Sequence, residues 1–175
     1  LVGTEWKSEP YVGDRVLVCD ASSNILSKPI DVSRYGLIYA GAQKNLGPAG
    51  VTIVIIKKDL LDRAPETIPS YMTYKTHANK NSAYNTPPVW AIYMVGLVAK
   101  WLIKKGGLIE ICRKNKEKAE LLYNMIDGEF YSGIATPDSR SLMNVTFLLP
   151  SKELEVTFLE DSEKEGLYTL KGHRS

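Results

Sequence analysis

The sequence predicts an α/β fold in which short, buried strands form a layer beside helices. Three segments of strand length are almost purely apolar, at residues 15–20, 36–42 and 51–56, and polar connections separate them. A longer apolar segment at residues 87–107 begins with paired prolines and ends with paired glycines, as helices often do. Buried strands combined with long helices are typical of layered α/β architectures.

Each apolar segment has its own strand signal. Residues 15–20, RVLVCD, contain an uninterrupted apolar run that ends on the carboxylate of Asp20. Residues 36–42, GLIYAGA, form the second predicted strand. Residues 51–56, VTIVII, are rich in β-branched side chains and give the strongest strand signal of the chain. Because none of these runs has a helical period, we expect buried strands.

The segment at residues 87–107 is predicted to form a buried helix, because it is apolar on nearly every face. Its uncharged run from Val89 to Ala99 is well short of the ~20 residues that cross a bilayer, so no membrane span is predicted. The aromatic residues Trp90, Tyr93 and Trp101 lie at helical spacings. We expect these three side chains in the core rather than beneath a cofactor.

The pattern changes near residue 106, which divides the chain into predicted domains at residues 1–105 and 106–175. Residues 108–127 carry their apolar side chains on one stripe, as amphipathic helices do. Residues 140–149 alternate between apolar and polar side chains, as half-exposed strands do. Residues 153–166 stay ambiguous, because VTFL favours a strand while the acidic flank and terminal glycine favour a helix. The second domain is therefore expected to be α+β.

Charge and cysteine content exclude some partners. The formal net charge is +2, from 22 basic and 20 acidic residues, which leaves no broad basic face for nucleic acid. Cys19 and Cys112 form no metal-binding spacing, which argues against a zinc site or a disulfide framework and favours the cytoplasm. The chain starts at Leu1 and stops at residues 171–175 without a closing signal, so we expect a piece of a longer protein.

Lys44 is the most informative residue, because it lies in a turn of small residues between two predicted strands. The turn, AGAQKNLGPAG at residues 40–50, lets a ligand approach the backbone closely. A lysine partly removed from water has a lowered pKa and can form a Schiff base with a carbonyl. The alternative is an ordinary solvated charge. A Walker phosphate loop is excluded, because Lys44 precedes Gly47 and the loop has no GK[ST] sequence.

Asp20 indicates related chemistry. A carboxylate at the end of an apolar strand is costly to bury unless a cation meets it. It could cap a turn together with Ser22 and Ser23, or it could pair with a protonated ring nitrogen. A Schiff-base lysine and an acid directed at a pyridinium are the groups with which proteins hold pyridoxal phosphate as an electron sink.

Three stretches of the chain follow one another in this order: SSNILSKPIDVSRYGLIYAGAQKNLGPAGVTIVIIKKDLL, YKTHANKNSAYNTPP and LKGHRS. Together they resemble the phosphoserine aminotransferase family, whose members are pyridoxal-phosphate enzymes of the aspartate-aminotransferase fold. The likeness covers nearly the whole chain but only about the latter half of the family's. It implies part of the large three-layer domain of a fold-type I enzyme, followed by the start of a smaller α+β C-terminal domain.

The resemblance assigns roles to residues around the cofactor. Lys44 matches the lysine that forms the Schiff base and later moves the substrate's proton. Asp20 matches the acid that keeps the pyridine nitrogen protonated, and Gln43 matches a residue on the cofactor phosphate. Asn85 and Thr86 match a pair that reaches this phosphate from the neighbouring subunit, which implies a homodimer with shared active sites.

His173 and Arg174 match the family's ligands for the phosphate of the substrate. From the residues alone they would be a surface histidine and a solvated arginine, yet a guanidinium beside an imidazole is a suitable phosphate clamp. His77 falls outside the matched contacts and is expected to be a polar loop residue. Several site residues of the family have no match in this chain, so we expect the 175 residues alone to be inactive.

The implied reaction transfers the amino group of L-glutamate to 3-phosphohydroxypyruvate, giving O-phospho-L-serine and 2-oxoglutarate in L-serine biosynthesis. A role in pyridoxine biosynthesis is left open. One alternative is another enzyme of this fold, such as an alanine–glyoxylate aminotransferase or a cysteine desulfurase, although the KGHR sequence speaks against both. The other is a non-catalytic remnant that only dimerises or binds a partner.

Overall fold

The computed structural model describes residues 2–171, and the expectation for His173 and Arg174 lies outside them. The chain forms two compact units, one of Pro10–Arg113 and one that joins the residues up to Glu9 to those from Lys114 on. The predicted domain boundary at residue 105 stays a prediction. The boundary between the compact units lies after Arg113, and the N-terminal residues belong to the same unit as the C-terminal ones.

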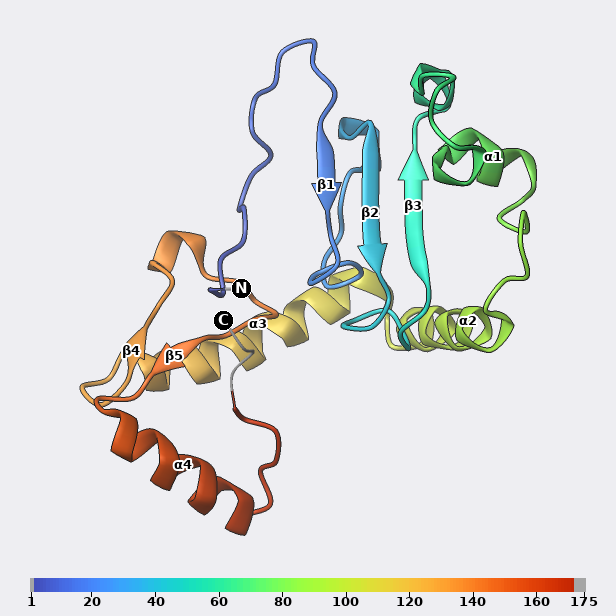
Figure 1. Ribbon diagram of the computed structural model, residues 1–175. Helices are drawn as coiled ribbons and strands as arrows, with labels where there is room; N and C mark the ends of the chain where they lie inside the picture. The colour runs from blue at the N-terminus through green and yellow to red at the C-terminus, as the bar shows by residue number, and fades with distance from the viewer. Residues whose placement is uncertain (1, 172–175) are drawn as a thin grey trace. The chain divides into compact units, whose positions relative to one another are not determined.

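A three-stranded sheet forms the centre of the Pro10–Arg113 unit (Figure 1), with the strand order β1-β2-β3. The strands are β1 at Val18–Asp20, β2 at Leu37–Gly41 and β3 at Thr52–Ile56. β1 pairs with β2 in parallel, and β2 pairs with β3 in antiparallel orientation. All three predicted strands are therefore confirmed, although the first is shorter than its apolar run.

Burial is uneven across the sheet. In β2, Ile38 and Ala40 are 2% and 0% exposed, and they pack with Ala21 in the core. β1 and β3 expose Val18 and Val54, because each of these strands has a neighbour on one side only. The prediction of fully buried strands is thus correct for three of the five residues of β2 and wrong for β1 and β3 within this chain.

Short helices connect the larger elements of this unit. A turn of 3₁₀ helix lies between β1 and β2 at Val32–Arg34, and two more follow β3 at Lys58–Arg63 and Ser70–Met72. Helix α1 spans Tyr74–Asn79, and the hydroxyl of Thr73 caps it by accepting a hydrogen bond from the Thr76 amide at 3.4 Å.

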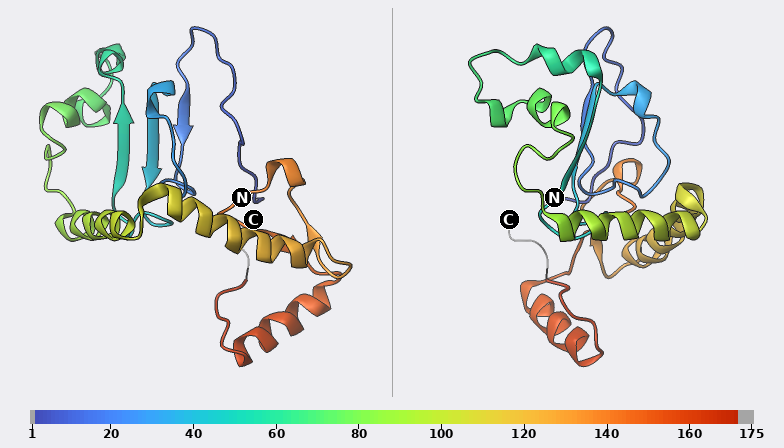
Figure 2. Two further views of the ribbon diagram at one scale, coloured as in Figure 1. Left: turned by 180° about the vertical axis from the view of Figure 1, so that it is seen from behind. Right: turned by 90° about the vertical axis from the view of Figure 1, so that its right-hand side faces the viewer.

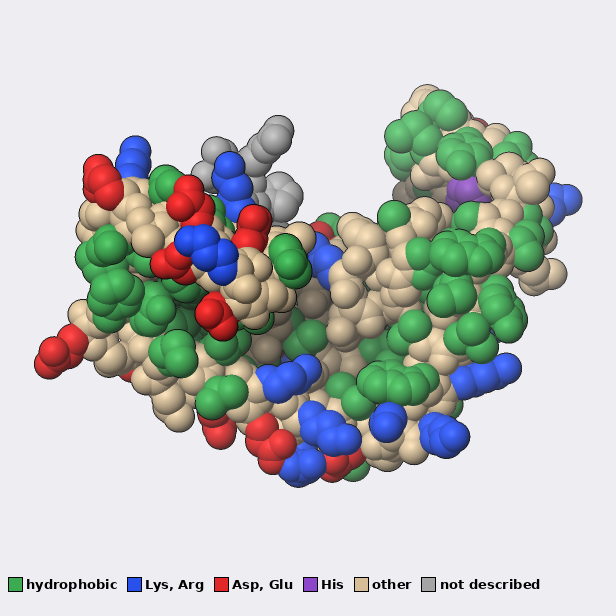
Figure 3. Space-filling model, turned by 90° about the horizontal axis from the view of Figure 1, so that it is seen from below, with side chains coloured by type: hydrophobic (Ala, Val, Ile, Leu, Met, Phe, Trp, Pro, Cys, Tyr) green, Lys and Arg blue, Asp and Glu red, His purple; other side chains and the backbone are tan. Residues whose placement is uncertain are grey.

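Helix α2 spans Val89–Lys104, which confirms the predicted helix. It ends before Gly106 and Gly107, whose φ angles of 102° and 71° suit glycine and stop the helix. Its predicted burial is wrong for this chain, since only Ala91 and Leu102 are buried. Figure 3 shows hydrophobic side chains gathered on the side of the molecule where α2 lies.

The three aromatic residues of α2 also depart from expectation. Trp90, Tyr93 and Trp101 are 66%, 62% and 53% exposed, so they are not core residues of this chain. They stay uncovered because α2 is apolar on more faces than its own unit covers. Among residues 2–171, no helix combines the length and the hydropathy that crossing a membrane requires.

Helix α3 spans Gly107–Ile126 and confirms the predicted amphipathic helix. The elements that follow are β4 at Ser132–Gly133, a 3₁₀ turn at Pro137–Ser139, β5 at Phe147–Leu148, and α4 at Lys152–Lys164. β4 and β5 pair in antiparallel orientation. The ambiguous segment is therefore a helix, which Ser151 caps by accepting a hydrogen bond from the Leu154 amide at 3.3 Å.

The strand predicted at residues 140–149 is reduced to β5. At its start, the hydroxyl of Ser141 accepts hydrogen bonds from the amides of Met143 and Asn144, both at 3.1 Å. This local turn removes the two amides from any strand ladder. The alternating pattern was therefore a correct signal for β5 and a wrong one for the residues before it.

Gly3 and Glu5 lie beside this turn. The Ser141 amide donates to the carbonyl of Gly3 at 2.8 Å, and the Glu5 amide donates to that of Ser139 at 2.7 Å. Between them, the Arg140 guanidinium forms two hydrogen bonds with the Asp127 carboxylate and lies 4.5 Å from the Tyr123 ring centroid. The second unit is therefore closed by contacts between segments distant in sequence.

Candidate active site

Two of the predicted site residues meet at one edge of the sheet. β1 and β2 run parallel, so their carboxyl ends lie together (Figure 1). Asp20 is the last residue of β1 and lies opposite Tyr39 of β2. The turn with Lys44 follows the end of β2 directly, and the positive charge of Lys44 acts on Asp20. The structure thus places the acid and the amine at the same edge of the sheet.

The carboxylate of Asp20 is held in its ionised form. Its Oδ1 accepts a hydrogen bond from the Ser22 amide at 2.9 Å. Hydrogen bonds from the Ser22 hydroxyl and amide lower the pKa of Asp20, with smaller effects from the Tyr39 hydroxyl and Lys44. The carboxylate in turn raises the pKa of Tyr39, chiefly through its charge. Asp20 therefore does cap a turn, and its exposed carboxylate remains an acceptor.

Lys44 lies on the outside of its turn. Its Nζ donates a hydrogen bond to Oγ of Ser23 at 2.9 Å, and the residue is exposed. The expectation of an amine partly removed from water is thus wrong for this chain, because the residues around it are small and leave it open to solvent. With a serine hydroxyl as its partner, Lys44 still presents a primary amine at the sheet edge where Asp20 lies.

The turn itself is firmly fixed. The carbonyl of Ala42 accepts hydrogen bonds from the amides of Leu46 and Gly47 at 3.1 and 2.9 Å. Leu46 is only 2% exposed. A Cβ added at Gly47 would lie 3.0 Å from Cγ2 of Val95, so glycine permits the turn to pack against α2. Gly47, one of the small residues around Lys44, therefore serves this packing.

Gln43 folds back over the end of β2. A Cβ added at Gly41 would lie 2.5 Å from Oε1 of Gln43, so the missing side chain leaves the space that the amide occupies. The amide of Gly41 donates to Oγ of Ser22 at 3.1 Å. Ser22 thus contacts both strand ends. Gln43 is exposed, and its amide lies at the same edge as Asp20.

Sequence reasoning missed Tyr39 and treated Ser22 and Ser23 only as turn residues. The serine pair was visible after Asp20, and it offered a signal for hydroxyl donors beside the carboxylate. Tyr39 offered none, because only the pairing register of β1 and β2 places it opposite Asp20.

Asn85 and Thr86 lie in the segment between α1 and α2, and both are exposed. Nδ2 of Asn85 donates to the carbonyl of Thr86 at 3.3 Å. Their segment runs beyond β3, on the side away from β1, in both views of the ribbon (Figure 1 and Figure 2, left). Within one chain they therefore stand apart from Asp20.

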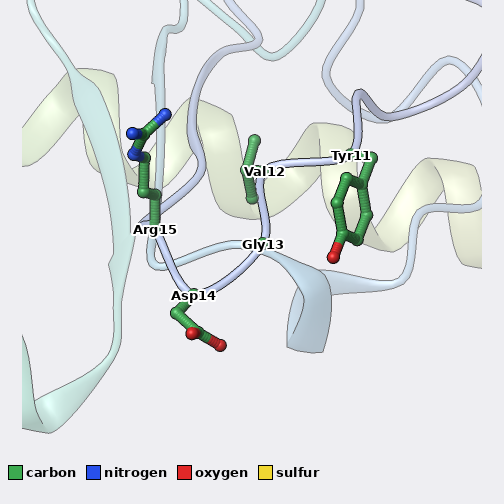
Figure 4. Close-up of a pocket in the computed structure, with 5 residues that line it drawn as sticks. All are labelled: Tyr11, Val12, Gly13, Asp14 and Arg15. Atoms are coloured by element: carbon green, nitrogen blue, oxygen red, sulfur yellow. The ribbon is translucent and has the colours of Figure 1, made fainter.

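His77 lies in α1, so the prediction of a loop residue is wrong. A shallow hollow elsewhere in the unit is lined by Tyr11, Val12, Gly13, Asp14 and Arg15, and Figure 4 shows that it is the bend of a single loop. It contains none of the predicted site residues. Over residues 2–171, no cluster of three histidine, cysteine or acidic side chains is arranged to hold a metal ion.

Comparison with known proteins gives consistent matches. The family model described as aminotransferase class-V matches residues 10–175. A phosphoserine aminotransferase of Lysinibacillus sphaericus (strain C3-41) is 53% identical over 177 residues, which cover 100% of this chain and 49% of the relative. The chain thus spans about half the length of the curated relatives it matches.

Solved structures give the same result. A phosphoserine aminotransferase structure from a study of radiation damage to the Schiff base has a TM-score of 0.95 and 47% identity. The match covers 99% of this chain and 49% of the chain in that structure. A phosphoserine aminotransferase from Trichomonas vaginalis with PLP bound has a TM-score of 0.92 and 39% identity, over 98% and 49% of the two chains. These likenesses confirm the predicted α/β fold, a part of the large domain of fold type I.

Proposed function

Since the chain belongs to the aminotransferase class-V family, we propose that the complete protein is a pyridoxal-phosphate-dependent phosphoserine aminotransferase. It would transfer the amino group of L-glutamate to 3-phosphohydroxypyruvate, giving O-phospho-L-serine and 2-oxoglutarate in L-serine biosynthesis. The observation that carries the proposal is the meeting of Asp20 and Lys44 at one sheet edge, in a chain 53% identical to a phosphoserine aminotransferase.

The residues at this edge fit pyridoxal phosphate. Asp20 is ionised at neutral pH because its pKa is lowered, so it can accept a hydrogen bond from a protonated ring nitrogen. Lys44 offers a primary amine. The hydrogen bond described for this amine is the one it donates to the hydroxyl of Ser23 at 2.9 Å. The amide of Gln43 can donate to a phosphate oxygen. When bound, the cofactor supplies the electron sink that lets an amino acid lose its α-hydrogen as a proton.

Each side chain then has a definite task. The charge of Asp20 keeps a proton on the ring nitrogen, because a carboxylate beside a cation favours the charged form. Nζ of Lys44 would accept the proton from the α-carbon of the amino donor and pass it to the bound cofactor, acting as a general base and then as a general acid. The hydroxyl of Ser23, which accepts from Nζ, orients the amine.

Asn85 and Thr86 are proposed to act in the neighbouring subunit of a homodimer. Their exposure, and the position of their segment beyond β3, support this assignment, because that segment lies on the opposite side of β3 from β1. A second copy would supply the cofactor phosphate they are expected to bind. The expected location is the cytoplasm, because the positions of Cys19 and Cys112 in the sequence do not indicate a disulfide framework.

His173 and Arg174 are proposed to bind the phosphate of the substrate, as the resemblance implies. A substrate comparison tests this part of the proposal with the complete protein. We expect kcat/KM for 3-phosphohydroxypyruvate to exceed that for hydroxypyruvate by about 10- to 100-fold or more, since each hydrogen bond to a charged group contributes about 1.5–3 kcal/mol. Equal values would remove the substrate assignment. We also expect Lys44→Ala to lose all amino-group transfer while the mass of the dimer stays unchanged.

A further inference from the structure

His77 connects two parts of the segment that leads to Asn85. Its Nε2 lies 2.7 Å from the carbonyl oxygen of Tyr71, and because a carbonyl only accepts, Nε2 carries the hydrogen and donates it. Its ring meets the rings of Tyr71 and Tyr84 edge-on, with centroids 5.3 and 6.1 Å away. Tyr71, His77 and Tyr84 are called the His77 cluster below. The cluster thus ties a residue before α1 to the residue immediately before Asn85.

The backbone of His77 holds the turn that follows α1. Its carbonyl accepts hydrogen bonds from the amides of Lys80 and Ser82 at 3.2 and 2.9 Å. Asn81 and Ser82 have φ angles of 50° and 61°, in the left-handed region that residues other than glycine rarely adopt. Two adjacent residues keep such a conformation only where the surrounding contacts determine it. The side chain and the carbonyl of His77 supply contacts of this kind.

We propose that the His77 cluster is a positioning device that presents Asn85 and Thr86 to the cofactor phosphate of the neighbouring subunit. Tyr84 fixes the chain on one side of the pair, and Pro87 and Pro88 stiffen it on the other. A segment that is ordered before it binds loses less conformational entropy on binding. The inference rests on the proposed function, and it assigns His77 a positioning role rather than contact with the cofactor.

The affinity of the complete apoprotein for pyridoxal phosphate tests the role of the cluster. The variants are His77→Phe, which keeps a ring but loses the hydrogen bond, and Tyr84→Ala, which removes the ring contacts of Tyr84 with His77 and Tyr71. We expect each to raise the dissociation constant roughly five- to tenfold, the effect of about one hydrogen bond or ring contact. Tyr11→Ala, at a tyrosine that is 98% exposed, is the matched control and should leave it unchanged. His77→Gln, which restores a donor, should recover part of the loss.

A double-variant cycle separates positioning from general stability. In an Asn85→Ala, Thr86→Val background, adding His77→Phe should cause no further loss of affinity, because the groups it positions are already gone. Full additivity, or an unchanged dissociation constant in both cluster variants, would overturn the inference. If His77→Phe does not fold, Tyr84→Ala carries the same cycle. Failure of the wild-type protein to bind the cofactor would instead overturn the proposed function.

Discussion

Asp20 is the residue whose electrostatics are best defined in the candidate site. Hydrogen bonds from Ser22 keep its pKa below the ordinary value of 3.8, so the carboxylate is charged throughout the neutral range. In the complete protein, Asp20→Asn should lower kcat by about 10- to 100-fold, because a hydrogen bond to a charged group contributes about 1.5–3 kcal/mol. Steady-state kinetics measure this. Asp14→Asn, at an exposed loop residue, is the control, and equal loss in both variants would contradict the assigned role.

Asp127 gives a prediction for stability and pH. Hydrogen bonds from Arg140 lower the pKa of Asp127 below its ordinary 3.8, so the pair stabilises the fold above that value. The contribution disappears as the pH falls through the lowered pKa, since the protonated acid no longer attracts the guanidinium. Melting temperatures measured below pH 5 should therefore fall less steeply in Asp127→Asn than in wild type. Asp138→Asn should melt with the wild-type pH dependence, and identical slopes in all three proteins would refute the prediction.

At the residue scale, sequence reasoning found the pair that matters most and missed its neighbours. Lys44 and Asp20 were identifiable because each breaks an apolar or small-residue context. Tyr39 was not identifiable, because it joins the site only through the pairing of β1 with β2. The exposure of Lys44 could not be predicted either. Small neighbouring residues indicate that another group can come close to Lys44, but they do not indicate whether protein atoms or solvent occupy that space.

At the element scale, the location of helices and strands was largely predictable, and their burial was not. The start and end of α2 followed from its prolines and glycines, which act locally on the backbone. Its burial depends on what packs against it, and most of its apolar faces find no partner in this chain. β5 is short for a local reason that alternation does not reveal, namely the turn closed by the hydroxyl of Ser141.

Gly3 tests how the N-terminal segment is packed in its unit. Its φ is 75°, and an added Cβ would lie 2.7 Å from the carbonyl oxygen of Asn144. Gly3→Ala should lower the free energy of unfolding by about 1–3 kcal/mol, through backbone strain and this collision. Gly13→Ala is a matched control, since Gly13 has a φ of 57° and open space around it. Denaturant unfolding that shows equal losses for both variants would argue against the packing described here.

At the scale of the whole molecule, the exposed apolar surface is the main feature. Val89, Trp90, Tyr93 and Ile103 of α2 are all more than half exposed. A polypeptide of residues 1–175 alone should therefore aggregate or bind a hydrophobic dye, while the complete protein should form no assembly larger than its dimer and bind no dye. Light scattering and dye fluorescence measure both. The double variant Trp90→Gln, Ile103→Gln should reduce dye binding by the fragment. A monomeric fragment that binds no dye would contradict this prediction.

The length of the relatives gives this surface its context. The matches span nearly all of this chain but only about half of each curated relative. In a protein as long as those relatives, further chain would be available to pack against this surface. The α/β class was predictable from local patterns alone, whereas the edges of the sheet were not.

The central claim is that the amine of Lys44 becomes covalently joined to pyridoxal phosphate. The most direct test mixes the complete protein with the cofactor, reduces it with borohydride, digests it and locates the modified peptide by mass spectrometry. The account predicts a reduced pyridoxyl group on Lys44 of AGAQKN, and its absence from Lys57 and Lys58, which close β3 and serve as internal controls. A protein that stays unmodified at Lys44, or that is labelled equally at all three lysines, would contradict it.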